Sequence, residues 1–142
     1  DGAIHRGAGI ELIDECKKWI QVYGSLKTGK AMITKGYNLS AKHIIHTVGP
    51  IYSQHAAQEN DILLQNCYQN CLELASDYHR KTIAFCSIST GVYGFPIERA
   101  SQVALETIVR FLEENDSFEQ VIFVLYSQPV FESFLKTIKT IV

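Results

Sequence analysis

The sequence predicts an α/β fold of three layers, in which helices cover both faces of a mostly parallel mixed sheet. Two short apolar runs, at 82–87 and 121–125, lack polar alternation, which is typical of strands buried on both faces of a parallel sheet. Helical patterns separate the predicted strands, so strands and helices alternate along the chain. The 142 residues are 46% hydrophobic, enough for the core of one domain.

The individual elements follow from the spacing of apolar residues and from turn signals. Asp1 is a candidate N-cap, but Gly7 and Gly9 weaken the first turns, so the first helix is expected to begin near Ile10 and to end at Gly24. The polar residues 51–60 predict a loop. Strands are predicted at 30–35, 43–48, 82–87 and 121–125, and further helices at 62–78, 97–112 and 130–141.

Composition excludes several classes of function. A formal net charge of −2 argues against electrostatic capture of nucleic acid. No pair of cysteines has a zinc-ligand spacing, so we expect no metal and no cofactor. The longest apolar run, 121–126, is too short to cross a membrane. Reduced, buried thiols in a cytoplasmic protein are the expected state of the four cysteines, Cys16, Cys67, Cys71 and Cys86.

A glycine loop at 87–96, between a predicted strand and a predicted helix, is the main candidate site. Gly91 and Gly94 allow a sharp turn and close approach of the backbone to a ligand, and the free N–H groups of such a loop suit phosphate. The loop has no Lys, so it is not the nucleotide-binding P-loop. An ordinary strand-to-helix turn that needs glycine for its geometry is the alternative. The candidate ligand-binding residues here are Ser89, Thr90, Gly91, Val92, Tyr93 and Gly94.

Other polar residues offer weaker signals. Asp1 precedes Gly2, Ala3 and Ile4, so backbone N–H groups lie next to its carboxylate; it is either a helix cap or a carboxylate that orients water. Ser89 lacks the GxSxG context of a hydrolase nucleophile. Three histidines are expected to have structural or surface positions and no catalytic role. His46 is interpreted as a strand residue whose ring is hydrogen-bonded, and His55 and His79 as surface residues.

Four motifs together resemble the macrodomains, in particular the bacterial and mitochondrial branch that removes ADP-ribose from proteins. They are DGAIHR at 1–6, YNLSAK at 37–42, HTVGP at 46–50 and ISTGVYGFP at 88–96. The resemblance implies a three-layer domain that binds ADP-ribose at the strand ends. It also implies that the glycine loop wraps the diphosphate and distal ribose, with Tyr93 against that ribose. By the same resemblance Asp1 is catalytic, Gly2, Ala3 and Ile4 help to hold the diphosphate, and Tyr126 lies near the adenine.

One part of the family pattern has no counterpart in residues 1–142. The family carries a central strand followed by an Asn-Ala-Ala-Asn segment before the position of Asp1. We therefore predict a single macrodomain over 1–142 that lacks its N-terminal strands. A sheet without its middle strand leaves buried backbone groups unpaired, which is costly. We expect the strands to come from a segment that precedes Asp1 or from another chain.

The resemblance implies hydrolysis of ADP-ribose esters, either mono-ADP-ribosylated acidic side chains or O-acetyl-ADP-ribose. Asp1 would orient or deprotonate a water for attack at the ester carbonyl or at the anomeric carbon. The alternative is a reader that binds ADP-ribosylated proteins without cleaving them, which needs the glycine loop but not Asp1. The expected partners are thus ADP-ribose or an ADP-ribosylated protein, without nucleic acid or membrane; the near-neutral charge argues against direct RNA binding.

Overall fold

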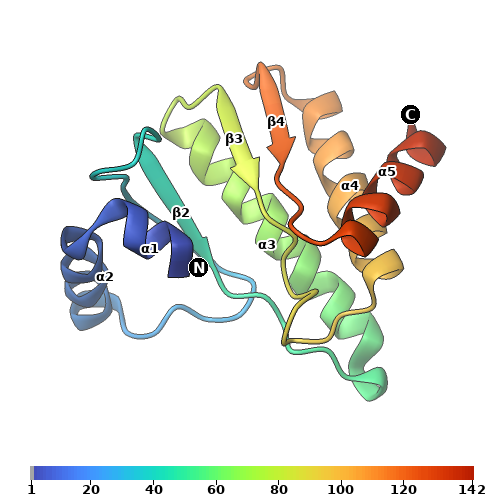
Figure 1. Ribbon diagram of the computed structural model, residues 1–142, viewed down its shortest axis with the longest axis horizontal. Helices are drawn as coiled ribbons and strands as arrows, with labels where there is room; N and C mark the ends of the chain where they lie inside the picture. The colour runs from blue at the N-terminus through green and yellow to red at the C-terminus, as the bar shows by residue number, and fades with distance from the viewer. Residues whose placement is uncertain (1) are drawn as a thin grey trace.

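The computed structural model describes residues 2–142, which form helices around two short pairs of strands (Figure 1). The predicted α/β class is confirmed. The expected cap at Asp1 lies outside the described residues. The elements, in chain order, are α1 (Gly2–Ala8), α2 (Ile10–Tyr23), β1 (Ala31–Lys35), β2 (His43–Thr47), the 3-10 turn η1 (Gln54–Ala56), α3 (Ala57–Asp77), β3 (Thr82–Phe85), α4 (Ile97–Glu114), β4 (Gln120–Phe123) and α5 (Gln128–Ile141).

The strands pair in two separate ladders. β1 and β2 are antiparallel, with Ala31 opposite Thr47, whereas β3 and β4 are parallel, with Thr82 opposite Gln120. Within residues 2–142 no ladder joins β2 to β3. The described strands are therefore mixed in direction, and completion of the sheet by further strands stays a prediction.

Helices α3, α4 and α5 form the core together with one face of β3 and β4. Aromatic rings link the layers: the ring centroid of Tyr68 on α3 lies 5.2 Å from that of Phe85, which lies 5.6 Å from Phe123. Phe123 in turn lies 4.9 Å from Phe134 of α5. Such pairs stabilise a core beyond the area they bury, so the parallel pair that leads into the glycine loop is firmly supported from one side.

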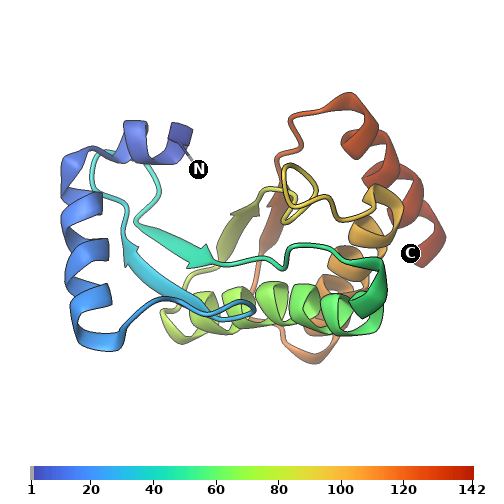
Figure 2. The same cartoon turned by 90° about the horizontal axis from the view of Figure 1, so that it is seen from below.

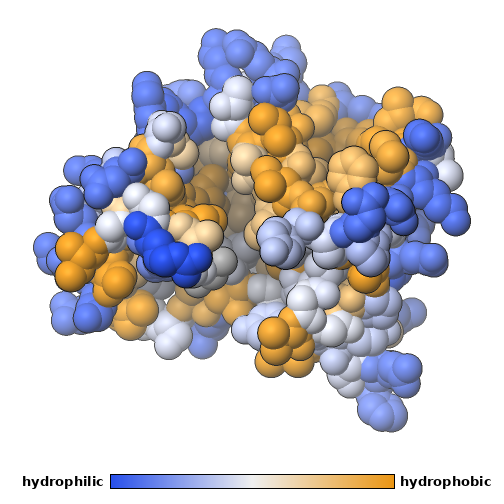
Figure 3. All heavy atoms as spheres, viewed as in Figure 1, coloured by the Kyte–Doolittle hydropathy of each residue, from blue (hydrophilic) through white to orange (hydrophobic). Residues whose placement is uncertain are grey.

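The opposite face of β3 and β4 is exposed, so the prediction that these strands are buried on both faces is wrong for residues 2–142. Ile122 is 42% exposed, and Val124, just beyond β4, is 64% exposed. The physical reason is that α3 and α4 lie on one side of the strands, as Figure 2 shows, and none of the helices in residues 2–142 lies over the other face of the pair. Apolar side chains therefore gather on the surface over this part of the molecule (Figure 3).

Three further predictions need correction. Cys86, directly after β3, is exposed rather than buried, and Cys16 is only half-buried. The helix predicted at 62–78 begins at Ala57, because the polar residues before Ile62 form its first turns. The helix predicted from near Ile10 to Gly24 is confirmed as α2, and Gly9, with φ of 96°, separates it from the additional helix α1. Among the described residues, none of the helices combines the length and apolarity needed to cross a bilayer.

Candidate ligand-binding site

The glycine loop, residues 87–96, joins the carboxyl end of β3 to α4, as predicted. The backbone N–H of Phe95 donates to Ser89 O at 2.9 Å, and the N–H of Gly94 donates to Gly91 O at 3.0 Å. These two bonds close the loop across its base and within its tip. Figure 1 places the loop at the same end of the parallel strands as the β4–α5 connection.

The tip of the loop presents backbone donors that have no acceptor in the described part of the chain. Within residues 2–142, no hydrogen bond joins the N–H of Thr90, Gly91, Val92 or Tyr93 to a protein acceptor. Val92 is fully exposed and Tyr93 is 40% exposed. A run of N–H groups on one exposed turn is an arrangement that binds anions, phosphate above all.

The two glycines of the loop have different explanations. Gly94 has φ of 70°, a conformation that side chains rarely adopt, so the turn itself requires glycine there. Gly91 does not have a positive φ, and a Cβ added to it would meet nothing within 4 Å. Neither backbone conformation nor packing therefore requires glycine at position 91. The space next to its Cα is open to a ligand.

The hydroxyl protons of Ser89 and Thr90 are used within the protein. Ser89 Oγ donates to Pro50 O at 2.9 Å, and Thr90 Oγ1 donates to Ser87 Oγ at 2.8 Å. A hydroxyl has one proton, so neither group has a donor left for a phosphate oxygen. At the loop tip, the main donors for an anionic ligand are therefore the backbone N–H groups.

Sequence reasoning missed the residues that support this loop. The hydroxyl of Tyr68, which is 1% exposed on α3, accepts the N–H of Ile88 at 3.1 Å. The N–H of Tyr52 donates to Tyr93 O at 2.9 Å. In the sequence, Tyr68 fits an apolar helical pattern, and Tyr52 lies in a stretch predicted to be a loop. No local signal marked either as a partner of residues 87–96.

Helix α1 carries the other predicted binding segment. Gly2, Ala3 and Ile4 are exposed, with Ile4 43% exposed. Figure 2 shows α1 and the glycine loop on the same side of the strands, and Figure 3 shows a hollow between the two parts. Asp1, the predicted catalytic residue, lies outside the described residues.

Tyr126, the predicted adenine contact, lies beyond β4 and is fully exposed. It directly precedes α5, whose N-cap Ser127 accepts the N–H of Val130 at 3.4 Å. The structure thus fixes the start of α5 and leaves the Tyr126 ring accessible at the loop end of the parallel strands. An exposed ring at this end of the strands is available for stacking on a base.

His46 on β2 has a satisfied ring, as predicted. Its Nε2 lies 3.0 Å from Thr34 Oγ1, and its ring centroid lies 6.4 Å from that of His5 on α1. Burial, and secondarily the neighbouring His5, lowers the pKa of His46, while Glu15 acts in the opposite direction. The lowered pKa favours the neutral form of the ring. His55 and His79 are exposed, as predicted.

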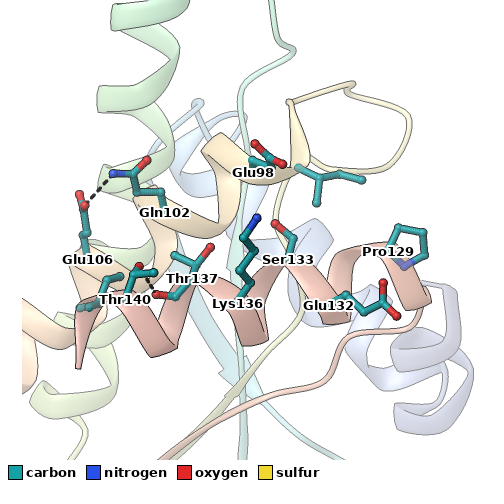
Figure 4. A pocket seen from close by; sticks show the side chains of 11 residues that line it. Glu98, Gln102, Glu106, Pro129, Glu132, Ser133, Lys136, Thr137 and Thr140 are labelled. Carbon is teal, nitrogen blue, oxygen red and sulfur yellow. Dashed lines mark hydrogen bonds between the residues drawn. The ribbon is translucent and has the colours of Figure 1, made fainter.

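A cavity of about 900 Å³ lies elsewhere, between α4 and α5 (Figure 4). Its charged lining consists of Glu98, Glu106 and Glu132 against a single cation, Lys136. Three carboxylates oppose the approach of a phosphate-bearing ligand. On charge, the glycine loop suits an anion and this cavity does not.

Comparisons with known sequences agree on one kind of domain. The family model described as "Macro domain" matches residues 1–104. Over 141 residues the chain is 48% identical to a "Macro domain-containing protein" of Methanosarcina mazei, covering 99% of this chain and 73% of that protein. It is also 48% identical over 128 residues to an "O-acetyl-ADP-ribose deacetylase" of Salmonella typhimurium, covering 90% of this chain and 71% of that protein.

Solved structures give the same result. A macrodomain of Oceanobacillus iheyensis with ADP superposes with a TM-score of 0.93 at 43% identity, over 99% of this chain and 74% of that chain. A macrodomain of Trypanosoma brucei in complex with ADP-ribose superposes with a TM-score of 0.85 at 35% identity, over 96% of this chain and 55% of that chain. The similarity therefore extends over nearly all the described elements.

Proposed function

Because the chain belongs to the Macro domain family, we propose that it binds ADP-ribose at the glycine loop and hydrolyses ADP-ribose esters. The observation that carries the binding proposal is the run of N–H groups at residues 90–93 that find no acceptor within residues 2–142, next to the open space at Gly91. Relatives named as an O-acetyl-ADP-ribose deacetylase and, in Xenopus laevis, an ADP-ribose glycohydrolase support the reaction.

Each part of the ligand has a group that suits it. The diphosphate accepts hydrogen bonds from the loop N–H groups, which are neutral, so binding there requires no metal. Tyr93 provides a flat wall for the distal ribose, and Tyr126 provides an exposed ring for the adenine. Gly2, Ala3 and Ile4 contribute to holding the diphosphate from the α1 side of the hollow.

In the proposed reaction, the carboxylate of Asp1 orients a water and accepts its proton. For O-acetyl-ADP-ribose the water oxygen attacks the ester carbonyl, the bond to the ribose oxygen breaks, and acetate and ADP-ribose are released. For a modified acidic side chain, attack at the anomeric carbon releases the free carboxylate of the protein and ADP-ribose. General-base assistance of this kind contributes about 10²- to 10⁴-fold.

Calorimetry with ADP-ribose on the full-length protein tests the binding site. Gly91→Glu should abolish measurable binding, because a carboxylate would occupy the space proposed for phosphate; like charges this close lower affinity by about 100-fold or more. The fold should persist, since a Cβ added at position 91 meets no described atom within 4 Å.

Two variants control this experiment. Gly91→Gln separates bulk from charge and should bind better than Gly91→Glu. Ser25→Glu adds the same charge in the exposed segment after α2 and should bind as the wild type does. Equal affinity of the wild type and a folded Gly91→Glu variant would place the ligand somewhere other than the glycine loop.

A further inference from the structure

Ser89, at the start of the glycine loop, has an uncommon backbone conformation. Its φ is 67°, in the left-handed region that favours glycine and that L residues with a side chain seldom occupy. Its carbonyl oxygen accepts the N–H of Phe95 at 2.9 Å and so closes the base of the loop. A residue in this conformation persists only where surrounding contacts hold it.

The contact that holds Ser89 comes from the segment after β2. Ser89 Oγ donates to Pro50 O at 2.9 Å. Gly49, which is buried, lies directly against the same side chain: a Cβ added at Gly49 would overlap Ser89 Oγ and would lie 2.6 Å from Ile88 Cγ2. Packing requires glycine at position 49 for this reason, whereas it does not at position 91. The N–H of Tyr52 then ties the same segment to Tyr93 O at 2.9 Å, close to the loop tip.

We infer that Ser89 is a positioning residue, whose hydroxyl fixes the glycine loop to the segment at Gly49 and Pro50 and thereby aims the loop N–H groups at the ligand. The identity of the ligand rests on the proposed function, whereas the role of Ser89 in holding the loop rests on its contact with Pro50. If the loop is held in its binding conformation before the ligand arrives, binding does not carry the free-energy cost of ordering the loop. If the hold is lost, the apparent affinity falls with the fraction of loops still in that conformation.

The first experiment uses the protein without ligand. Hydrogen exchange is measured at the N–H of Phe95 and of Tyr52, which report the base of the loop and its link to Tyr93. Ser89→Ala should speed exchange at both N–H groups by about tenfold, which corresponds to the free energy that a typical hydrogen bond contributes. Ser101→Ala is the matched control, because Ser101 Oγ also donates to a backbone carbonyl, that of Glu98, at 2.9 Å, but on α4. It should leave both exchange rates unchanged.

The second experiment compares two replacements of Ser89 by calorimetry with ADP-ribose. Both variants lose the hydroxyl. A φ of 67° is unfavourable for alanine, as it is for serine, whereas glycine adopts it freely. Ser89→Ala should weaken binding by about tenfold, and Ser89→Gly by only about two- to threefold. If the hydroxyl instead contacted the ligand directly, alanine and glycine would weaken binding to the same extent.

The outcomes separate this inference from the proposed function. A wild-type protein that fails to bind ADP-ribose overturns the proposed function, while the exchange rates still decide whether Ser89 holds the loop. Unchanged exchange at Phe95 and Tyr52 in Ser89→Ala overturns the inference. Equal losses of affinity in the alanine and glycine variants overturn it as well, even where the wild type binds tightly.

Discussion

Replacing Tyr68 by Phe removes a buried hydroxyl beneath the glycine loop and leaves the aromatic ring in the core. The ring centroids of Tyr68 and Phe85 lie 5.2 Å apart, so the packing is retained. The N–H of Ile88, which donates to the hydroxyl at 3.1 Å, loses its partner. Ile88 is half-buried, and leaving its N–H unpaired there costs about 1–2 kcal/mol. For a chain of this size each kcal/mol shifts the melting temperature by about 3 °C, so a decrease of about 3–6 °C is expected.

Differential scanning calorimetry on Tyr68→Phe measures this decrease, with Tyr52→Phe as the control. The structure gives the Tyr52 hydroxyl no partner among residues 2–142, so its removal should change the free energy of unfolding by less than about 0.5 kcal/mol. ADP-ribose affinity should fall only in Tyr68→Phe, because Ile88 begins the loop. If Tyr68→Phe melts within about 1 °C of the wild type, the hydroxyl does not support the loop, and the reasoning from burial is refuted.

Three further predictions concern catalysis, metal and pH. Asp1→Ala should keep ADP-ribose affinity within a few-fold while kcat for ester hydrolysis falls by about 100-fold or more; full turnover in this variant would favour the reader function. EDTA should leave hydrolysis unchanged, because residues 2–142 bring together no three side chains that could hold a metal ion; loss of turnover that a divalent ion restores would contradict this. The lowered pKa of His46 means that the unfolded chain binds its proton first, so stability is present above about pH 6.5 and is lost as pH falls from there through the folded pKa. The melting temperature should depend less on pH in His46→Gln, and His79→Gln is the exposed control.

The place of the glycine loop between a strand and a helix followed from local sequence, whereas the contacts that support the loop did not. Gly91 and Gly94 between an apolar run and a helical pattern predicted a strand, a glycine turn and a helix, with a phosphate-binding turn and an ordinary turn as the alternatives. Tyr68 and Pro50 contact that turn from positions 20 and 39 residues away from their partners, Ile88 and Ser89. Neither contact has a local pattern, because each depends on how distant elements meet.

The predicted burial of the strands failed for a similar reason. Ile122 and Val124 have the apolar character of a strand covered on both sides, yet their side of β4 is exposed. Apolar character shows that a face favours burial, but not which element covers it. The start of α3 at Ala57 depends on a polar residue that takes part in the fold. Asn60, in the polar stretch before Ile62, is buried, and its Oδ1 accepts the N–H of Ser53 at 2.9 Å.

A titration of the full-length protein with ADP-ribose, followed by backbone amide NMR, tests the central claim most directly. The claim is that the unpaired N–H groups at residues 90–93 bind the diphosphate. The largest shifts should therefore occur at those amides, with smaller shifts at Tyr126 and along α1, and they should saturate together. Largest shifts at Ser133 and Lys136, in the cavity between α4 and α5, with residues 90–93 unmoved, would contradict the account.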